Sequence, residues 1–116
     1  MAVKLNKRAY EHAQQLIREG MVKLDERDDW SEHRPSASAE NEFIEAHGFD
    51  QYARWHLGVD DDASPNTKGR HKYPYGDFRA VHRCAVISAE SRAGQYDHTE
   101  IEKAVAHLHG MLEALR

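Results

Sequence analysis

The sequence predicts a mainly α fold, a small four-helix domain with one short helix, with room for a two-stranded β-hairpin insert. Apolar residues recur every three or four positions along three long stretches, which is typical of helices that face a core. Capping residues and glycines flank these stretches. A chain of 116 residues with 40% apolar content can bury one core but not two, so we expect residues 1–116 to form one domain.

The first predicted helix covers residues 6–24, and Asn6 is its expected N-cap. Its apolar positions form a stripe of about 140° at 100° per residue, with charged and amide side chains opposite. The stripe consists of Ala9, Tyr10, Ala13, Leu16, Ile17, Gly20, Met21 and Leu24. Such a helix packs one face on the core.

The short helix follows a polar loop and ends near residue 47. Ser36 or Ser38 would cap its start, and Gly48 would end it. Glu40 falls among the inward-facing residues of this helix. A carboxylate placed there needs a partner, because burying an unpaired charge is costly.

Residues 52–59 fit a strand slightly better than a helix, because apolar and polar side chains alternate along them. Pairing with residues 71–75 would close a hairpin, with Pro74 on an edge strand. Otherwise residues 58–76 form a polar loop that is long for a structure of this size.

The third long stretch, residues 78–93, is apolar around most of its circumference and is predicted as the central helix, capped by Asp77. His82 and Arg92 lie within the apolar sector, so we expect both to be at least partly buried. Asp97 and Glu100 resemble a capping box for a last helix that runs to about Leu115.

Charge is unevenly distributed along the chain. Residues 25–50 carry nine acidic residues against two arginines, whereas a basic patch lies between residues 68 and 83. The patch comprises Lys68, Arg70, Lys72, Arg79 and Arg83. Basic groups among aromatics can bind nucleic acid, but the pI of about 6.1 makes mutual attraction of the two regions the favoured interpretation.

Neither a metal nor another cofactor is predicted from local spacing. Among the nine histidines no two are three or four residues apart, and the Glu-x-x-His pattern of di-iron bundles does not occur. Cys84 lies two residues from His82, which on one helix turns the side chains apart and predicts a buried, unreactive thiol. A metal site assembled from distant loops, and a pH sensor built from the histidines, are left open.

The predicted function is therefore non-catalytic binding or regulation at a polar patch spanning residues 68–92, with a small anionic ligand or partner. The candidate ligand site combines His82, Arg92 and Glu40 with Tyr73, Tyr75 and the segment 30–33 as walls. A role in packing alone is the alternative for this polar network. Two other functions stay open: a small enzyme using His82 as acid/base and Arg92 as anion anchor, and a nucleic-acid-binding accessory protein.

Self-association through the first or last helix is also expected. A membrane partner is not, because the sequence has no apolar run of 18 residues. The single cysteine and the absence of a signal peptide's apolar segment favour a reducing compartment, so we expect a cytoplasmic protein.

Overall fold

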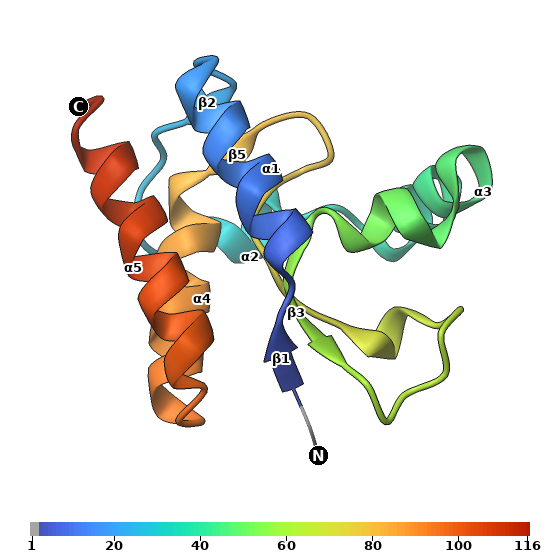
Figure 1. Cartoon of the computed structure of the whole chain (residues 1–116). Coiled ribbons are helices and arrows are strands. Elements are labelled where there is room, and N and C mark those ends of the chain that lie inside the picture. Colours follow the sequence, from blue (N-terminus) through green and yellow to red (C-terminus); the bar gives the residue numbers. More distant parts are fainter. Residues whose placement is uncertain (1–2) are drawn as a thin grey trace.

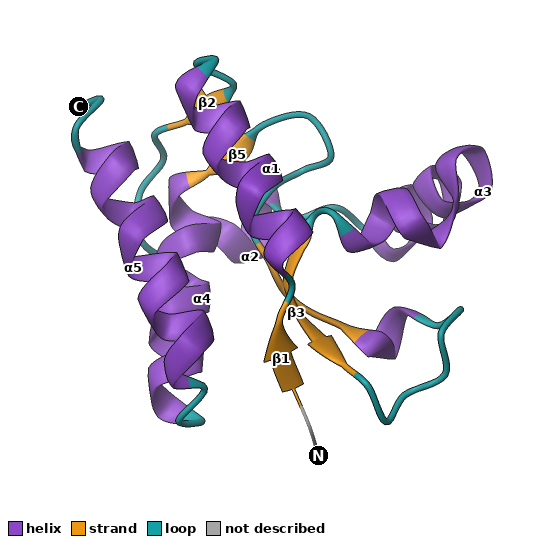
Figure 2. Ribbon diagram, viewed as in Figure 1, coloured by secondary structure: helices purple, strands orange, loops and turns teal. Residues whose placement is uncertain are grey.

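The structure is a computed structural model that describes residues 3–116 (Figures 1 and 2). The helices are α1 Lys7–Arg18, α2 Trp30–His33, α3 Ala37–Ala53, α4 Arg83–Gln95 and α5 Thr99–Glu113. The strands are β1 Val3–Leu5, β2 Val22–Lys23, β3 His56–Asp60, β4 His71–Pro74 and β5 Val81–His82, and a 3-10 turn, η1, covers Lys68–Arg70.

The predicted mainly α, four-helix fold is wrong. The described residues contain five helices and two sheets: an antiparallel sheet in the order β1-β3-β4 and a parallel pair of β2 and β5. Three of the strands are only two or three residues long. Segments that short carry no readable alternation, so their pairing comes from the tertiary structure rather than from a local pattern.

The hairpin alternative corresponds to one part of the larger sheet. His56 pairs with Pro74, and Val59 pairs with His71. β4 is an edge strand, as Pro74 requires, while β1 adds to the other side of β3. The ambiguous stretch divides: residues up to Ala53 are helical, and the strand begins at His56.

The helices predicted over residues 6–24 and 78–93 are both shorter than expected. α1 ends at Arg18 because Gly20 adopts a positive φ of 76°, after which the Met21 carbonyl accepts the Val81 N–H. Asn6 does cap α1, since its side chain accepts the Ala9 N–H. The chain beyond the glycine becomes β2 instead of a further helical turn.

α4 begins at Arg83 rather than at residue 78, and Asp77 caps a turn rather than the helix. Asp77 Oδ1 accepts the N–H groups of Arg79 and Ala80, at 3.0 and 2.8 Å. Val81 and His82 then extend as β5 beside β2. His82 is therefore on a strand that leads directly into a helix.

The core lies where α1, α4 and α5 pack with β3 and β4. α4 and α5 run side by side, while α3 projects away from them (Figure 1). α5 contributes Ile101, Val105, Leu108 and Leu112, and α1 contributes Ala9, Ala13 and Ile17. Much of each amphipathic face is thus covered within the fold, and self-association stays a prediction.

α3 and α5 show which capping predictions hold. Ser36 caps α3, and Gly48 kinks it with a φ of 82°. The predicted capping box before α5 is wrong, because Asp97 has a positive φ of 58° and His98 precedes the first helical residue.

None of the helices formed by residues 3–116 combines the length and the apolar character needed to cross a bilayer.

His56 is expected to make folding stability depend on pH. Its ring is buried in β3, its Nδ1–H donates to the Tyr52 carbonyl, and burial lowers its pKa to about 4. The unfolded chain, with an ordinary pKa near 6.5, therefore binds more protons between pH 6.5 and 4, and stability falls as the pH falls. We expect a loss of about 3 kcal/mol between pH 7 and 4 from this group.

Urea unfolding of the wild type and His56→Gln at both pH values measures this loss. His71, whose ring centroid lies 5.8 Å from that of His56, contributes in the same direction, because burial lowers its pKa as well. A pH dependence equally steep in His56→Gln would contradict the assignment to His56.

Candidate metal centre

His82 is buried, as predicted, and carboxylates face both of its ring nitrogens. Nδ1 lies 2.7 Å from Asp25 Oδ2, and Nε2 lies 2.8 Å from Asp77 Oδ2. Carboxylate oxygens accept hydrogen bonds but donate none when ionised. The His82 ring is thus oriented by carboxylates on both sides, and a metal ion bound to one nitrogen would keep the other nitrogen on its carboxylate.

Asp25 reaches this position because it follows β2 directly. Lys23 pairs with His82, so the chain two residues later passes the start of α4, where Cys84 N–H donates to Asp25 Oδ1 at 2.8 Å. Burial would raise the pKa of Asp25, but the bonds from Cys84 N–H, the His82 and His33 rings and the Cys84 thiol together lower it to about 2. This carboxylate is held ionised, with Oδ2 directed at the imidazoles.

His33, at the end of α2, completes the cluster with Cys84. His33 Nδ1 lies 2.7 Å from Asp25 Oδ2 and 3.9 Å from Cys84 Sγ. One oxygen, two nitrogens and one sulfur, from Asp25, His33, His82 and Cys84, lie within 4.8 Å of one another. We call these four residues the DHHC cluster.

The donor set matches that of a zinc ion. Zn²⁺ binds thiolate, imidazole and carboxylate tetrahedrally at about 2.0–2.3 Å, which spaces the donors by roughly 3.3–3.8 Å. The sulfur–nitrogen distance is close to that value, and the two oxygen–nitrogen distances of 2.7 Å require the rings to move outward by about 0.6 Å. The Asp77 carboxylate on the second nitrogen of His82 is the usual partner of a metal-bound imidazole.

The same geometry argues against a nucleophilic triad. In a triad the histidine contacts the acid with one nitrogen and the nucleophile with the other. Here His33 uses the same nitrogen, Nδ1, toward both Asp25 and Cys84. Burial and the neighbouring Asp25 carboxylate also raise the pKa of the Cys84 thiol to about 12, so without a metal ion it is a poor nucleophile.

The DHHC cluster is accessible from solvent. An open pocket of about 470 Å³ is lined by three of its members together with Lys23 and Leu24. The His33 side chain is 38% exposed, whereas that of His82 is 7% exposed. An ion can therefore enter past His33, and His82 forms the inner wall.

The residues predicted to form a ligand site are not brought together as a group. Arg92 is exposed, contrary to the expected burial, because the space beside that part of α4 is a surface pocket. Glu40 contacts the Tyr52 hydroxyl and Lys68 rather than Arg92. The hydroxyl of the fully buried Tyr75 donates a hydrogen bond to the Arg54 carbonyl and is also hydrogen-bonded to His12 Nδ1.

Only Tyr73 joins Arg92, in a pocket of about 400 Å³ that Lys72 also lines. His82 is not available as an acid or base for a substrate in this arrangement, because both of its ring nitrogens are already engaged by carboxylates. The five residues therefore divide among four different surroundings.

The predicted basic patch is partly neutralised within the fold. Three of its five members form ion pairs: Lys68 with Glu40, Arg70 with Asp61, and Arg83 with Glu113. Arg83 also donates to the Asp25 carbonyl. Of these ion pairs, Lys68 with Glu40 joins the basic patch to the acidic region 25–50, whereas Asp61 and Glu113 lie outside that region.

Sequence reasoning missed Asp25, Asp77 and Cys84 as site residues, and it included His33 only within the wall segment 30–33. The error concerning Cys84 came from placing it on one helix with His82, where a spacing of two turns side chains apart. In the structure His82 is on a strand and Cys84 in the first helical turn, so both side chains reach Asp25. The available signal was the Asp77-to-Cys84 stretch, which concentrates acid, imidazole and thiol at an element boundary.

Comparisons with protein-family models, with curated proteins and with solved structures give no match, so the functional argument depends on the chemistry of the DHHC cluster.

Proposed function

We propose that this chain is a small, non-catalytic binding domain that holds one Zn²⁺ ion through Asp25, His33, His82 and Cys84. The observation that carries the proposal is the convergence of four metal-type donors from two stretches of the chain, residues 25–33 and 82–84. Four protein ligands fill a tetrahedral shell, which is typical of structural rather than catalytic zinc. The metal would join the loop after β2 and the short helix α2 to the start of α4.

Zinc is favoured over other ions by the donors themselves. A thiolate and two imidazoles are soft or borderline ligands that magnesium and calcium do not prefer. Cys84 lies in the first turn of α4, where the helix N-terminus favours a negative charge on sulfur. Binding of the ion would displace the Cys84 proton, which burial otherwise retains.

Titration of metal-free protein with Co²⁺ tests the proposal, because tetrahedral cobalt bound to a thiolate has an intense absorption from sulfur-to-metal charge transfer. We expect one Co²⁺ per chain, displaced by one Zn²⁺, with the charge-transfer band lost in Cys84→Ser. Asp77→Asn should weaken Zn²⁺ binding by about 10- to 100-fold, as the loss of a ligand-orienting carboxylate does elsewhere.

The matched control is His107→Ala, which removes an exposed imidazole that contacts Tyr10 and not the DHHC cluster. Its affinity should equal that of the wild type. Unchanged metal binding in Cys84→Ser, or a loss of affinity in His107→Ala as large as that in Cys84→Ser, would overturn the proposal.

A further inference from the structure

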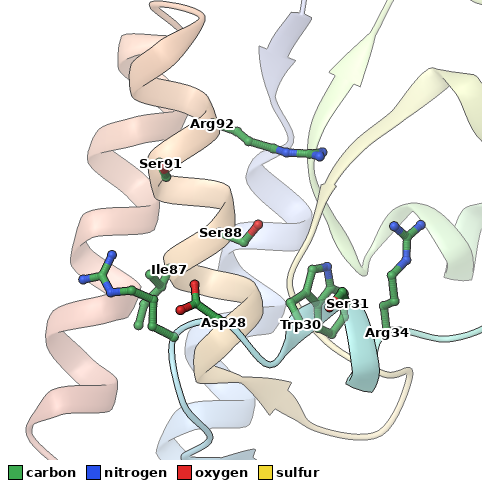
Figure 3. A pocket seen from close by; sticks show the side chains of 9 residues that line it. Asp28, Trp30, Ser31, Arg34, Ile87, Ser88, Ser91 and Arg92 are labelled. Atoms are coloured by element: carbon green, nitrogen blue, oxygen red, sulfur yellow. The ribbon is translucent and has the colours of Figure 1, made fainter.

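A second pocket lies on the other side of the loop that supplies two of the proposed metal ligands. It has a volume of about 410 Å³, within the usual size range of small-molecule sites. The loop and α2 form one wall, and one face of α4 forms the other (Figure 3). The lining residues are Arg27, Asp28, Trp30, Ser31, Arg34, Ile87, Ser88, Ser91 and Arg92, which we call the arginine pocket.

The arginine pocket has the chemistry of an anion site. Three arginines line it against one acidic residue, Asp28. Within residues 3–116, Arg27, Arg34 and Arg92 have no ion pair, whereas Arg70, Arg83 and Arg116 do. Unpaired arginines are common on protein surfaces. Three around one cavity, together with the Asp28 carboxylate, give the cavity a net charge of about +2. The forked N–H donors of a guanidinium group also match the geometry of phosphate oxygens.

Hydroxyl groups and an aromatic ring complete the walls. Ser88 and Ser91, three residues apart on α4, add hydroxyl donors. In Figure 3, Arg34 and Arg92 extend from opposite walls on the side of the pocket where Trp30 lies. The Trp30 ring also packs against His82, with centroids 5.7 Å apart. This ring therefore contacts the DHHC cluster and lines the arginine pocket at once.

The arginine pocket and the DHHC cluster share one short segment of chain. Asp25 and His33 bracket the four pocket residues Arg27, Asp28, Trp30 and Ser31, and Arg34 follows immediately. α2 has no buried residue of its own, so apolar packing does little to hold this segment on α4. Ligation of the segment at both ends would fix the pocket wall before a ligand arrives, which lowers the ordering cost of binding.

We infer that the arginine pocket binds a small molecule bearing a phosphoryl group, and that Zn²⁺ in the DHHC cluster strengthens this binding. The inference rests on the proposed zinc site. The coupling is reciprocal, so the phosphoryl ligand must raise the Zn²⁺ affinity by the same factor. Two negative charges on a phosphate monoester match the net charge of the pocket, and a planar ring on the ester can pack on Trp30.

Isothermal titration of the full chain with inorganic phosphate and with phenyl phosphate tests the inference, using metal-free protein and protein loaded with one equivalent of Zn²⁺. We expect loading to tighten phenyl phosphate binding at least fivefold, and Arg92→Gln in loaded protein to weaken it at least tenfold. Arg8→Gln, which removes an exposed arginine on α1, is the matched control and should bind like the wild type. Tighter binding of phenyl phosphate than of inorganic phosphate would support packing on Trp30.

The outcomes separate the two proposals. If Zn²⁺ binds while phosphate and phenyl phosphate do not, or bind Arg92→Gln as well as the wild type, the arginine pocket is overturned and the zinc site stands. The second result would place the phosphate outside the arginine pocket. If Zn²⁺ does not bind, both the proposed function and the coupling fail.

Discussion

Saturation with Zn²⁺ is expected to raise the thermal unfolding midpoint of this protein by about 15 °C. A ligand that binds only the folded state, at a thousandfold excess over its dissociation constant, stabilises it by about 4 kcal/mol. For a chain of 116 residues, each kcal/mol shifts the midpoint by roughly 4 °C. Calorimetry or circular dichroism of metal-free and loaded protein measures the shift.

His33→Ala is the most informative variant for this experiment. The His33 side chain is the most exposed of the DHHC cluster, so its loss should alter the metal-free protein little and yet remove most of the Zn²⁺-induced shift. Mg²⁺, which prefers oxygen ligands, should leave the midpoint of the wild type unchanged. An equal Zn²⁺ shift in wild type and His33→Ala would mean that the ion binds elsewhere.

Gly76→Ala is expected to destabilise the fold by about 3 kcal/mol, at the upper end for an added methyl group in a packed interior. A Cβ at this position would clash with the Ala80 carbonyl oxygen and lie 2.7 Å from the Trp55 ring. Gly76 also bridges to Val81, next to His82, so the backbone shift that relieves the clash must displace β5. Urea unfolding of metal-free protein measures the loss.

Gly110→Ala is the matched control, since it makes the same chemical change in the last turn of α5. No atom lies within 4 Å of the position that its added methyl group would take, and alanine favours the helix by about 0.5–1 kcal/mol. The two variants should therefore change stability in opposite directions. A Gly76→Ala protein as stable as the wild type would show that the Gly76–Val81 turn is not tightly packed.

Several local features were predictable because they depend on neighbours in the sequence. The Asn6 cap and a cap by Ser36 or Ser38 follow from side chains within four residues, and the positive φ of Gly48 interrupts α3 at the predicted place, although the helix continues to Ala53 beyond it. The sequence favoured a strand over residues 52–59 only slightly; the pairing with residues 71–74 forms, but the strand begins at His56 and its burial does not alternate.

The sequence predicts burial of both His82 and Arg92 on the central helix, but only His82 is buried. His82 is buried, but it belongs to a strand where the apolar pattern predicts a helix. Arg92 does lie on α4, yet it is exposed. A mostly apolar circumference predicts that a helix is surrounded, but it does not predict which side remains open as a pocket.

The amino-acid sequence alone indicated the Asn6 cap, a serine cap before α3 and the burial of His82, and it favoured strand pairing of residues 52–59 with 71–75 only slightly. Only the tertiary structure decided that Asp25, His33, His82 and Cys84 meet. Their meeting depends on the parallel pairing of β2 with β5, two strands of two residues each that lie far apart in the sequence. Strands that short have no periodicity to read, and their register is set by the surrounding core.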